Sequence, residues 1–263
     1  MQNKTVEELD MKLTGNTIFI TGGGSGIGRA LAEALHHLGN KVIISGRRKE
    51  RLEEVLSANP GMSAVELDIQ DLSSIEATSK QLIQDFPELN VLFNNAGIML
   101  FDEAVGVIDE EILISTVSTN LLGPIRITSS LIEHLKSKED AVVINTTSAV
   151  GFIPYAATAI YSATKAALHS YTLSQRYLLK DTTVKVLEII PPGVQTELMT
   201  DLSKDPHAMP LEDFIKETIR LLGTDTEEVI VEQAKMIRDQ QGSNEGAFVT
   251  QLNDMASQAG TDH

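Results

Sequence analysis

Short apolar segments alternate with helical segments along most of the chain, and this alternation constrains the fold more than any other feature. Strands that alternate with helices form a parallel sheet covered on both faces, and right-handed crossovers make it doubly wound. The pattern therefore predicts a three-layer α/β/α domain with a doubly wound parallel sheet. Strands are expected at 17–20, 42–45, 64–68, 91–93, 141–145 and 184–190. Helices are expected at 27–38, from the end of the second strand to about 58, and at 72–85, 110–136 and 156–179.

A single domain accounts for the chain of 263 residues, because no Pro/Ser-rich linker and no internal repeat interrupts the alternation. Residues 1–10 are polar and acidic and are expected to be an N-terminal extension of the domain at 11–263. The part after residue 196 is expected to be mostly helical. Within it, 228–232 (EVIVE) fits a short edge strand or the start of a helix, and the pattern leaves both open.

Composition excludes several classes of function. The chain has no cysteine, which excludes disulfides, thiolate metal sites and cysteine nucleophiles, and its histidines lack metal-ligand spacing, so no metal is expected. The net charge of −16 argues against nucleic acid and anionic membranes as partners. No apolar run approaches the ~18 residues of a membrane span, and the N-terminus lacks a signal-peptide core. A cytoplasmic protein with a small-molecule substrate is expected.

A glycine-rich turn follows the first strand and reads Thr21-Gly22-Gly23-Gly24-Ser25-Gly26-Ile27-Gly28. Glycines at these positions allow the backbone to turn sharply and to approach a pyrophosphate, and the next helix begins with unpaired N–H groups and a positive dipole end. The spacing is G-x-x-x-G-x-G rather than G-x-G-x-x-G. A plain tight turn is the alternative, but the position between a first strand and an amphipathic helix favours dinucleotide binding.

The end of the second strand bears on the choice of cofactor. It reads Ser45-Gly46-Arg47-Arg48, where an NAD site usually has an Asp or Glu that accepts from the ribose hydroxyls. A guanidinium instead pairs with a 2′-phosphate. We therefore expect NADP(H) to be preferred over NAD(H). The alternative is that these charges are solvated at the start of a helix.

Ser148, Tyr161 and Lys165 form the candidate catalytic group. Ser148 follows the fifth strand, and Tyr161 and Lys165 lie four residues apart on the next helix, so they share one face near the strand ends. An ammonium about 4 Å from the phenol would stabilise tyrosinate by about 4 kcal/mol at an effective dielectric near 20. Lys165 is therefore expected to lower the pKa of Tyr161 toward neutrality. The alternative is that Tyr161 and Lys165 are ordinary surface residues of a helix.

In these residues the chain resembles the short-chain dehydrogenase/reductase family in its single-domain form. The match extends over the whole chain after Met11 and implies a Rossmann fold. The segments PPGVQTEL and HAMPLEDFI, with the helical C-terminus, are most similar to DltE-type oxidoreductases. The matching positions are Thr21-Gly22-x-x-x-Gly26-x-Gly28, Asp68, Asn94-Asn95-Ala96-Gly97, Asn120, Ser148 and Tyr161-x-x-x-Lys165.

The resemblance implies an oxidoreductase that transfers a hydride reversibly between a nicotinamide cofactor and a carbonyl or secondary alcohol. Tyr161 would be the acid/base, and Lys165 would lower its pKa and hydrogen-bond the nicotinamide ribose. Ser148 would hydrogen-bond the substrate oxygen. Asn120 would lie in the long helix and hold a water that links Lys165 to solvent.

The resemblance also implies a cofactor site and an oligomer. Pro192 replaces the glycine of the family's P-G-x-V-x-T motif, and an acidic helical tail replaces its Gly-rich end. A homodimer through the helices around 115–136 and 156–179 is therefore expected in preference to a homotetramer. The implied cofactor residues are Gly22, Gly24, Ser25, Gly26, Ile27, Gly28, Arg47, Arg48, Asp68, Ile69, Asn95, Ala96, Gly97, Tyr161, Lys165, Pro191, Gly193, Val194 and Thr196.

The substrate site is expected to be apolar. Residues at about 197–222 correspond to the family's variable lid, which closes over substrate. No Arg or Lys is placed to hold a substrate anion, so a neutral, hydrophobic ketone or aldehyde is expected. Core packing is the alternative for each pocket candidate. The candidates are Met99, Val150, Phe152, Ile153, Leu198, Met199 and Leu202.

An NADPH-dependent carbonyl reductase, or alcohol dehydrogenase in the reverse direction, is the function these features favour. A non-catalytic NADP(H)-binding regulatory protein of the same fold is the alternative, although the complete set of Asn120, Ser148, Tyr161 and Lys165 argues against it. A sugar-nucleotide epimerase or dehydratase would carry a larger C-terminal domain than this chain has.

Overall fold

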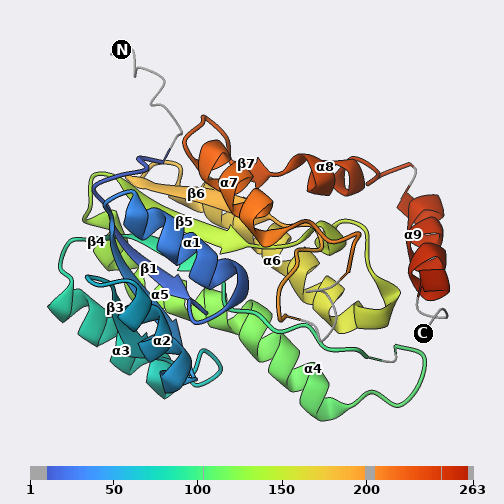
Figure 1. The fold of residues 1–263 in the computed structure, drawn as a ribbon, viewed down its shortest axis with the longest axis horizontal. Helices are drawn as coiled ribbons and strands as arrows, with labels where there is room; N and C mark the ends of the chain where they lie inside the picture. The colour runs from blue at the N-terminus through green and yellow to red at the C-terminus, as the bar shows by residue number, and fades with distance from the viewer. Residues whose placement is uncertain (1–10, 103, 199–204, 244, 260–263) are drawn as a thin grey trace.

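The computed structural model describes residues 11–102, 104–198, 205–243 and 245–259, and its strands form a seven-stranded parallel sheet (Figure 1). The spatial order is β3-β2-β1-β4-β5-β6-β7, so the chain winds outward from β1 on one side and from β4 on the other. This confirms the predicted doubly wound α/β fold. The strands are β1 Thr17–Thr21, β2 Lys41–Gly46, β3 Ser63–Glu66, β4 Leu89–Asn94, β5 Ala141–Thr146, β6 Val184–Ile190 and β7 Glu228–Ile230.

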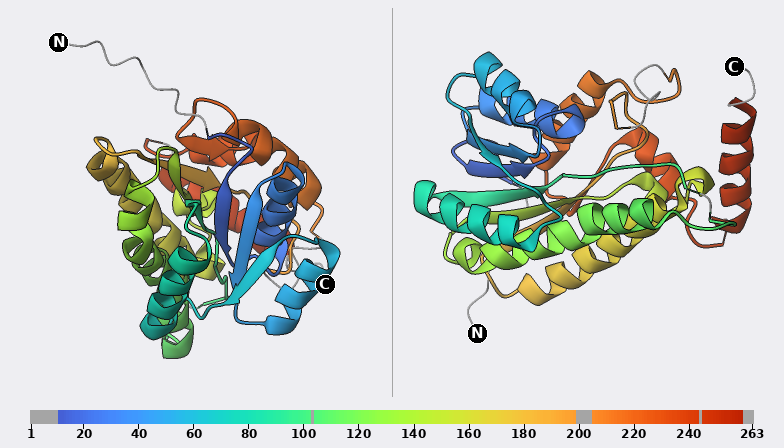
Figure 2. Two further views of the ribbon diagram at one scale, coloured as in Figure 1. Left: turned by 90° about the vertical axis from the view of Figure 1, so that its left-hand side faces the viewer. Right: turned by 90° about the horizontal axis from the view of Figure 1, so that it is seen from below.

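The central strands are apolar on both faces because helices cover both faces (Figure 2). In β1, Ile18 and Ile20 pack into one core layer and Phe19 into the other, and all three are completely buried. The first layer contains core residues of α1 Gly26–His37, α2 Lys49–Ala58, α7 Leu211–Leu222 and α8 Glu232–Arg238. The second contains core residues of α3 Leu72–Asp85, α5 Gly123–Lys136 and α6 Ala159–Leu179.

The helical stretch expected at 110–136 is present without a gap, but its middle is a π-helix, so the range divides into two α-helices joined by a π-helix. α4 (Glu110–Val117) passes into a five-residue π-helix, Ser118–Leu122, and α5 begins at Gly123. Pro124 has no N–H to donate to the carbonyl four residues earlier, and its ring would clash with that carbonyl in a regular α-helix. The wider turn therefore forms just before this proline, and it carries Asn120.

The segment at 228–232 contains both of the structures that the sequence left open. Residues Glu228–Ile230 form β7, which pairs in parallel with β6, and α8 starts at Glu232. α9 (Glu245–Ala259) lies at the edge of the molecule (Figure 1), where the Asn253 side chain hydrogen-bonds the Pro154 carbonyl and the Ala156 N–H. Within the described ranges, no helix has the length and apolar character needed to cross a membrane.

The N-terminal extension at 1–10 and residues 199–204, near the start of the predicted lid, lie outside the described residues. The second half of the predicted lid range forms α7, whose Phe214 and Leu222 are completely buried in the core. The lid itself stays a prediction. Met11 belongs to the domain, because its side chain is buried and its N–H donates to the Leu222 carbonyl at 3.3 Å.

Candidate active site

The predicted site residues gather where the parallel strands end. Hydrogen-bonded register places Asn94 at the end of β4 beside Asn145 of β5, and Thr146 beside Ile189 of β6. The segments that follow these strands therefore share one edge of the sheet, and α6 packs against β6 beneath them. This is the edge where doubly wound sheets bind their ligands.

Ser148, Tyr161 and Lys165 come together at this edge, as the sequence predicted, and all three side chains are buried. Ser148 is hydrogen-bonded to Tyr161. The Lys165 Nζ donates to the Thr146 carbonyl at 2.7 Å and lies 5.6 Å from the centre of the Tyr161 ring. The turn after β5 is thus linked to both α6 side chains, one through its serine hydroxyl and the other through its backbone.

Burial governs the ionisation of this group, and the expected lowering of the Tyr161 pKa by Lys165 is wrong for this structure. Burial raises the pKa of Tyr161 to about 12, while the hydrogen bond with Ser148 acts in the opposite direction. Burial also lowers the pKa of Lys165 to about 8. Desolvation disfavours the charged form of both groups, so Tyr161 is a protonated phenol at neutral pH.

Asn120 lies in the π-helix and bridges the loop after β4 to α6. Its Oδ1 accepts from the Ile98 N–H at 2.9 Å, and its Nδ2 donates to the Ile98 carbonyl at 2.8 Å and to the Thr164 hydroxyl at 3.3 Å. A Cβ built on Gly97 would lie 3.4 Å from this Oδ1 and 3.8 Å from the Lys165 Nζ. Asn120 and Lys165 therefore meet across Gly97. The water-holding role of Asn120 stays a prediction.

The glycine-rich turn is packed closely against the end of β4. Gly26 has a φ of +54°, which favours glycine, and a Cβ on Gly28 would lie 2.3 Å from the Asn95 Nδ2 and 2.4 Å from the Gly22 carbonyl oxygen. Ser25 is the N-cap of α1, and its side chain makes no capping hydrogen bond. The first turn of α1 is thus left with N–H groups that can bind an anion.

Two further predicted cofactor residues approach this turn. Thr196 packs against Gly26, whose Cβ would lie 3.6 Å from the threonine Cβ. Arg48 reaches across from the β2–α2 turn, and its Nη2 donates to the Ser25 hydroxyl at 3.2 Å. Backbone N–H groups, a hydroxyl and a guanidinium suit the phosphates of a dinucleotide, so the donors present fit a nicotinamide cofactor.

Asn95, Ala96 and Asp68 take part in local hydrogen bonds around this site. The Thr21 hydroxyl accepts from the N–H groups of Asn95 and Ala96, each at 3.0 Å, and it donates to the Phe93 carbonyl at 3.2 Å. Asp68 accepts from the Gln70 N–H at 3.0 Å. Ile69 is buried. Thr21 therefore holds the loop after β4 in place. It belongs to the glycine-rich motif, but it is not among the predicted cofactor residues.

The segment after β6 is hydrogen-bonded to its neighbours despite Pro192. Pro191 and Pro192 are buried, and the Pro191 carbonyl accepts from the Ala149 N–H at 2.9 Å. Beyond them, Val194 forms a parallel bridge with Met209, which donates to the Gly193 carbonyl at 2.8 Å. The proline therefore occupies the glycine position of the motif without preventing the chain from joining β5 to the segment around residue 209.

The predicted pocket residues fall into three groups. Met99 and Val150 are half-buried and Leu198 is exposed, so these three can reach a ligand. Phe152 and Ile153 are buried in the core, which fits the alternative of core packing. The Phe152 ring lies 4.6 Å from the His169 ring and 5.1 Å from the Arg238 guanidinium. Met199 and Leu202 lie outside the described residues.

Three comparisons place this geometry among known proteins. A family model described as short chain dehydrogenase matches residues 16–207. The "Uncharacterized oxidoreductase DltE" of Bacillus subtilis is 35% identical over 251 residues, which is 92% of this chain and 98% of that protein. The NADP-dependent 3-hydroxy acid dehydrogenase of Schizosaccharomyces pombe is 32% identical over 192 residues, 71% of this chain and 74% of that protein.

The fold also matches solved structures. A short chain dehydrogenase from Burkholderia cenocepacia J2315, in complex with NADP, superposes with a TM-score of 0.81 at 24% identity. The match covers 92% of this chain and 99% of that one. Most of the chain therefore follows a known arrangement.

Proposed function

Because the chain belongs to the short-chain dehydrogenase/reductase family, we propose that it is an NADPH-dependent reductase of neutral, hydrophobic ketones or aldehydes, with Tyr161 as the acid/base. Membership of the family makes it an oxidoreductase with a nicotinamide cofactor. The observation that carries the finer proposal is the convergence of Ser148, Tyr161 and Lys165 at the carboxyl edge of the sheet.

In the proposed reaction, a carbonyl group becomes a secondary or primary alcohol. The cofactor, when bound, supplies the hydride to the carbonyl carbon. The Tyr161 hydroxyl supplies the proton to the carbonyl oxygen, and the Ser148 hydroxyl hydrogen-bonds that oxygen. A pKa of about 12 keeps Tyr161 protonated at neutral pH, which is the form that a proton donor requires.

The preference for NADPH is supported by Arg48 and by the composition of the β2–α2 turn. The Arg48 guanidinium lies at hydrogen-bond distance from Ser25 in the glycine-rich turn. No Asp or Glu occurs in Ser45-Gly46-Arg47-Arg48 to repel a 2′-phosphate. Since a phosphate binds a guanidinium through charge-assisted hydrogen bonds, both features favour the phosphorylated cofactor.

The proposed substrate is uncharged because the segment between Ser148 and Tyr161 contains no basic residue. Met99, Val150 and Leu198 keep part of their apolar surface accessible and are the proposed contacts for such a substrate. The relative from Schizosaccharomyces pombe is named for 3-hydroxy acids, which carry a carboxylate. A substrate panel therefore needs both neutral carbonyl compounds and 3-oxo acids.

The test follows NADPH and NADH consumption at 340 nm with aliphatic and aromatic ketones and aldehydes and with 3-oxo acids. We expect turnover of neutral compounds with NADPH, and Tyr161→Phe is expected to lower kcat by at least about 1,000-fold while NADPH still binds, as measured by its fluorescence. No turnover of any panel compound by the wild type would refute the reductase proposal and favour a regulatory NADP(H)-binding protein. Turnover of 3-oxo acids alone would refute the neutral substrate.

We further propose a homodimer through the outer helices, as the family resemblance implies. Leu173, Tyr177 and Leu178 of α6 and Ile114 of α4 expose apolar surface. Burial of these side chains against a second copy would remove this surface from water. Sedimentation velocity of wild type and of Leu178→Glu tests it: the variant is expected to be monomeric, and a monomeric wild type would refute the dimer.

A further inference from the structure

A glutamate lies completely buried on β6, next to the edge strand β7, and the proposed reaction does not use it. Glu188 is on β6 between Leu187 and Ile189, and none of its surface is exposed. An ionised carboxylate is costly to bury unless hydrogen-bond donors or cations surround it. An apolar side chain at this position would avoid that cost. A carboxylate at this position therefore indicates a role other than core packing.

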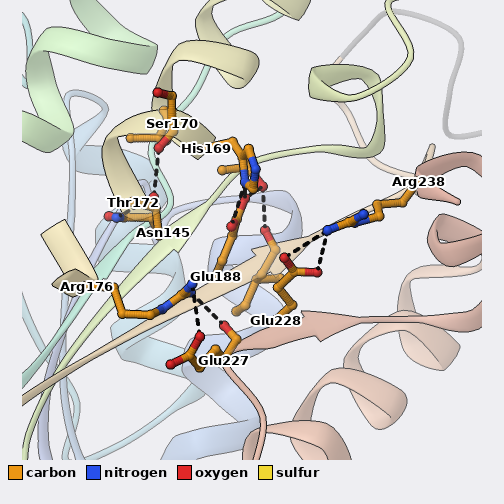
Figure 3. Close-up of polar contacts among 12 residues, drawn as sticks. Asn145, His169, Ser170, Thr172, Arg176, Glu188, Glu227, Glu228 and Arg238 are labelled. Atoms are coloured by element: carbon orange, nitrogen blue, oxygen red, sulfur yellow. Dashed lines mark hydrogen bonds and ion pairs between the residues drawn. The ribbon is translucent and has the colours of Figure 1, made fainter. Parts of the chain in front are cut away.

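The Glu188 carboxylate accepts hydrogen bonds from two different elements. The Thr147 hydroxyl donates to its Oε1 at 2.7 Å. The His169 Nδ1 lies 3.0 Å and 2.9 Å from the two Glu188 oxygens (Figure 3). Both contacts involve a charged acceptor, which makes hydrogen bonds shorter and stronger than neutral ones. One side chain on β6 therefore holds the turn after β5 and the middle of α6.

Both partners adjoin the proposed reacting groups. Thr147 stands between Ser148 and Thr146, whose carbonyl accepts from the Lys165 Nζ. His169 follows Lys165 by four residues, so it projects from the same face of α6 as Lys165. The relative position of Ser148 and the α6 side chains thus depends on two hydrogen bonds to the same carboxylate.

Further contacts hold His169 in place from the outer side. Its ring packs on Phe152, and the Arg238 guanidinium lies over the same phenyl ring. The Arg238 Nη2 contacts both Glu228 oxygens at 3.2 Å and 3.3 Å (Figure 3). The imidazole is therefore fixed between a carboxylate and an aromatic ring. This limits its rotation and keeps Nδ1 directed at Glu188.

We propose that Glu188, acting through Thr147 and His169, is a positioning residue that sets the distance between Ser148 and the Tyr161–Lys165 pair. The proposal rests on the proposed function, because it assigns these three residues to the reaction. Directional hydrogen bonds define a position more narrowly than apolar packing does, since they fix both distance and angle. A reacting group displaced by about 1 Å can lose about 100-fold in rate.

The test uses two substitutions of Thr147 that differ in one hydroxyl. Thr147→Val keeps the shape of the side chain but removes the donor to Glu188, whereas Thr147→Ser retains the donor. We expect Thr147→Val to lower kcat by about 10- to 100-fold with the KM for NADPH changed by less than about twofold, and Thr147→Ser to recover kcat to within about threefold of wild type. The substrate is the panel compound with the highest kcat/KM.

A matched control lies on the same helix, seven residues after Lys165. Thr172 is completely buried, and its hydroxyl accepts from the Asn145 amide at 2.9 Å (Figure 3). Thr172→Val therefore removes a comparable buried hydrogen bond that does not involve Glu188. It is expected to lower Tm while leaving kcat unchanged. An equal loss of kcat in Thr172→Val and Thr147→Val would mean that both act through stability, and it would overturn the proposal.

Histidine variants and crystal structures complete the test. His169→Asn keeps a donor near the position of Nδ1 and is expected to retain kcat better than His169→Leu, by about tenfold. Crystal structures of wild type and Thr147→Val should show the Ser148–Tyr161 hydrogen bond broken in the variant. An intact bond in the variant, or a kcat within twofold of wild type, would refute the positioning role.

The crystallographic comparison does not depend on turnover, so it separates a failure of the positioning role from a failure of the proposed function. A wild type that reduces nothing on the panel refutes the proposed function alone. Loss of the Ser148–Tyr161 bond in Thr147→Val would then still support positioning by Glu188, and its preservation would still refute it.

Discussion

Gly28 is the position where the structure leaves the least room for a side chain near the cofactor site. A Cβ there would lie 2.3 Å from the Asn95 Nδ2 and 2.4 Å from the Gly22 carbonyl oxygen. Neither atom can move freely: Asn95 donates from the same Nδ2 to the Thr21 carbonyl at 3.0 Å, and Gly22 has a φ of +70°. Gly28→Ala therefore has to push α1 away from the end of β4 by about 1 Å to restore ordinary contact.

Overpacking of this kind costs about 1–3 kcal/mol, and the rigid neighbours place Gly28→Ala near the upper end. In a domain of this size, about 2–3 kcal/mol corresponds to a Tm lowered by about 4–10 °C. The displaced helix start would also misplace the N–H groups that face the phosphates. We expect the Kd for NADPH to rise by at least about tenfold.

Differential scanning fluorimetry and NADPH fluorescence titration measure both effects. Gly24→Ala is a control for Tm in the same turn, because its Cβ would meet nothing closer than the Arg51 Cβ at 3.4 Å. Its Tm is expected to stay within about 2 °C of wild type, since that distance is ordinary contact. A Gly28→Ala protein that melts like wild type and binds NADPH as tightly would refute the steric reasoning.

Two further predictions concern charge. Lys165 has a pKa of about 8 when folded and 10.5 in its unshifted form, so the unfolded chain binds more protons between these values and stability rises with pH across that window. Lys165→Met should remove this rise of about 3 kcal/mol in the free energy of unfolding, measured by urea denaturation from pH 7 to 10.5. A free energy of unfolding that rises with pH as steeply in the variant as in the wild type would contradict this prediction. Arg48→Ala should raise the KM for NADPH by about 10- to 100-fold and leave that for NADH nearly unchanged, and equal effects on both cofactors would exclude a role at the 2′-phosphate.

Local pattern was enough to predict most of the fold. The helix expected at 72–85 is found as Leu72–Asp85, and Asp71 caps it by accepting from the Ser73 N–H at 2.8 Å. All six expected strands are present because apolar runs between helices have few other ways to be buried. Hydrophobic periodicity does not predict the π-helix at Ser118–Leu122, although Gly123-Pro124 in the middle of the helical stretch favours an irregular turn there.

The candidate site was less predictable because its chemistry depends on burial. The spacing of Tyr161 and Lys165 predicted their proximity but suggested that the ammonium would dominate the pKa of the phenol. In the structure, desolvation of each group is the larger effect. Desolvation depends on every atom packed around a side chain, and such packing has no signature in the spacing of two residues.

The sequence by itself determined the order of the strands and helices, the glycine-rich turn and the Ser148–Tyr161–Lys165 group, because each depends on residues close together in the chain or on a recurring motif. Only the tertiary structure decided that Glu188 meets Thr147 and His169, which are 41 and 19 residues away. A single glutamate in a strand and a single histidine on a helix resemble solvent-exposed residues in the sequence. Their pairing arises from the stacking of α6 on the sheet, which brings distant side chains into one region from which water is excluded.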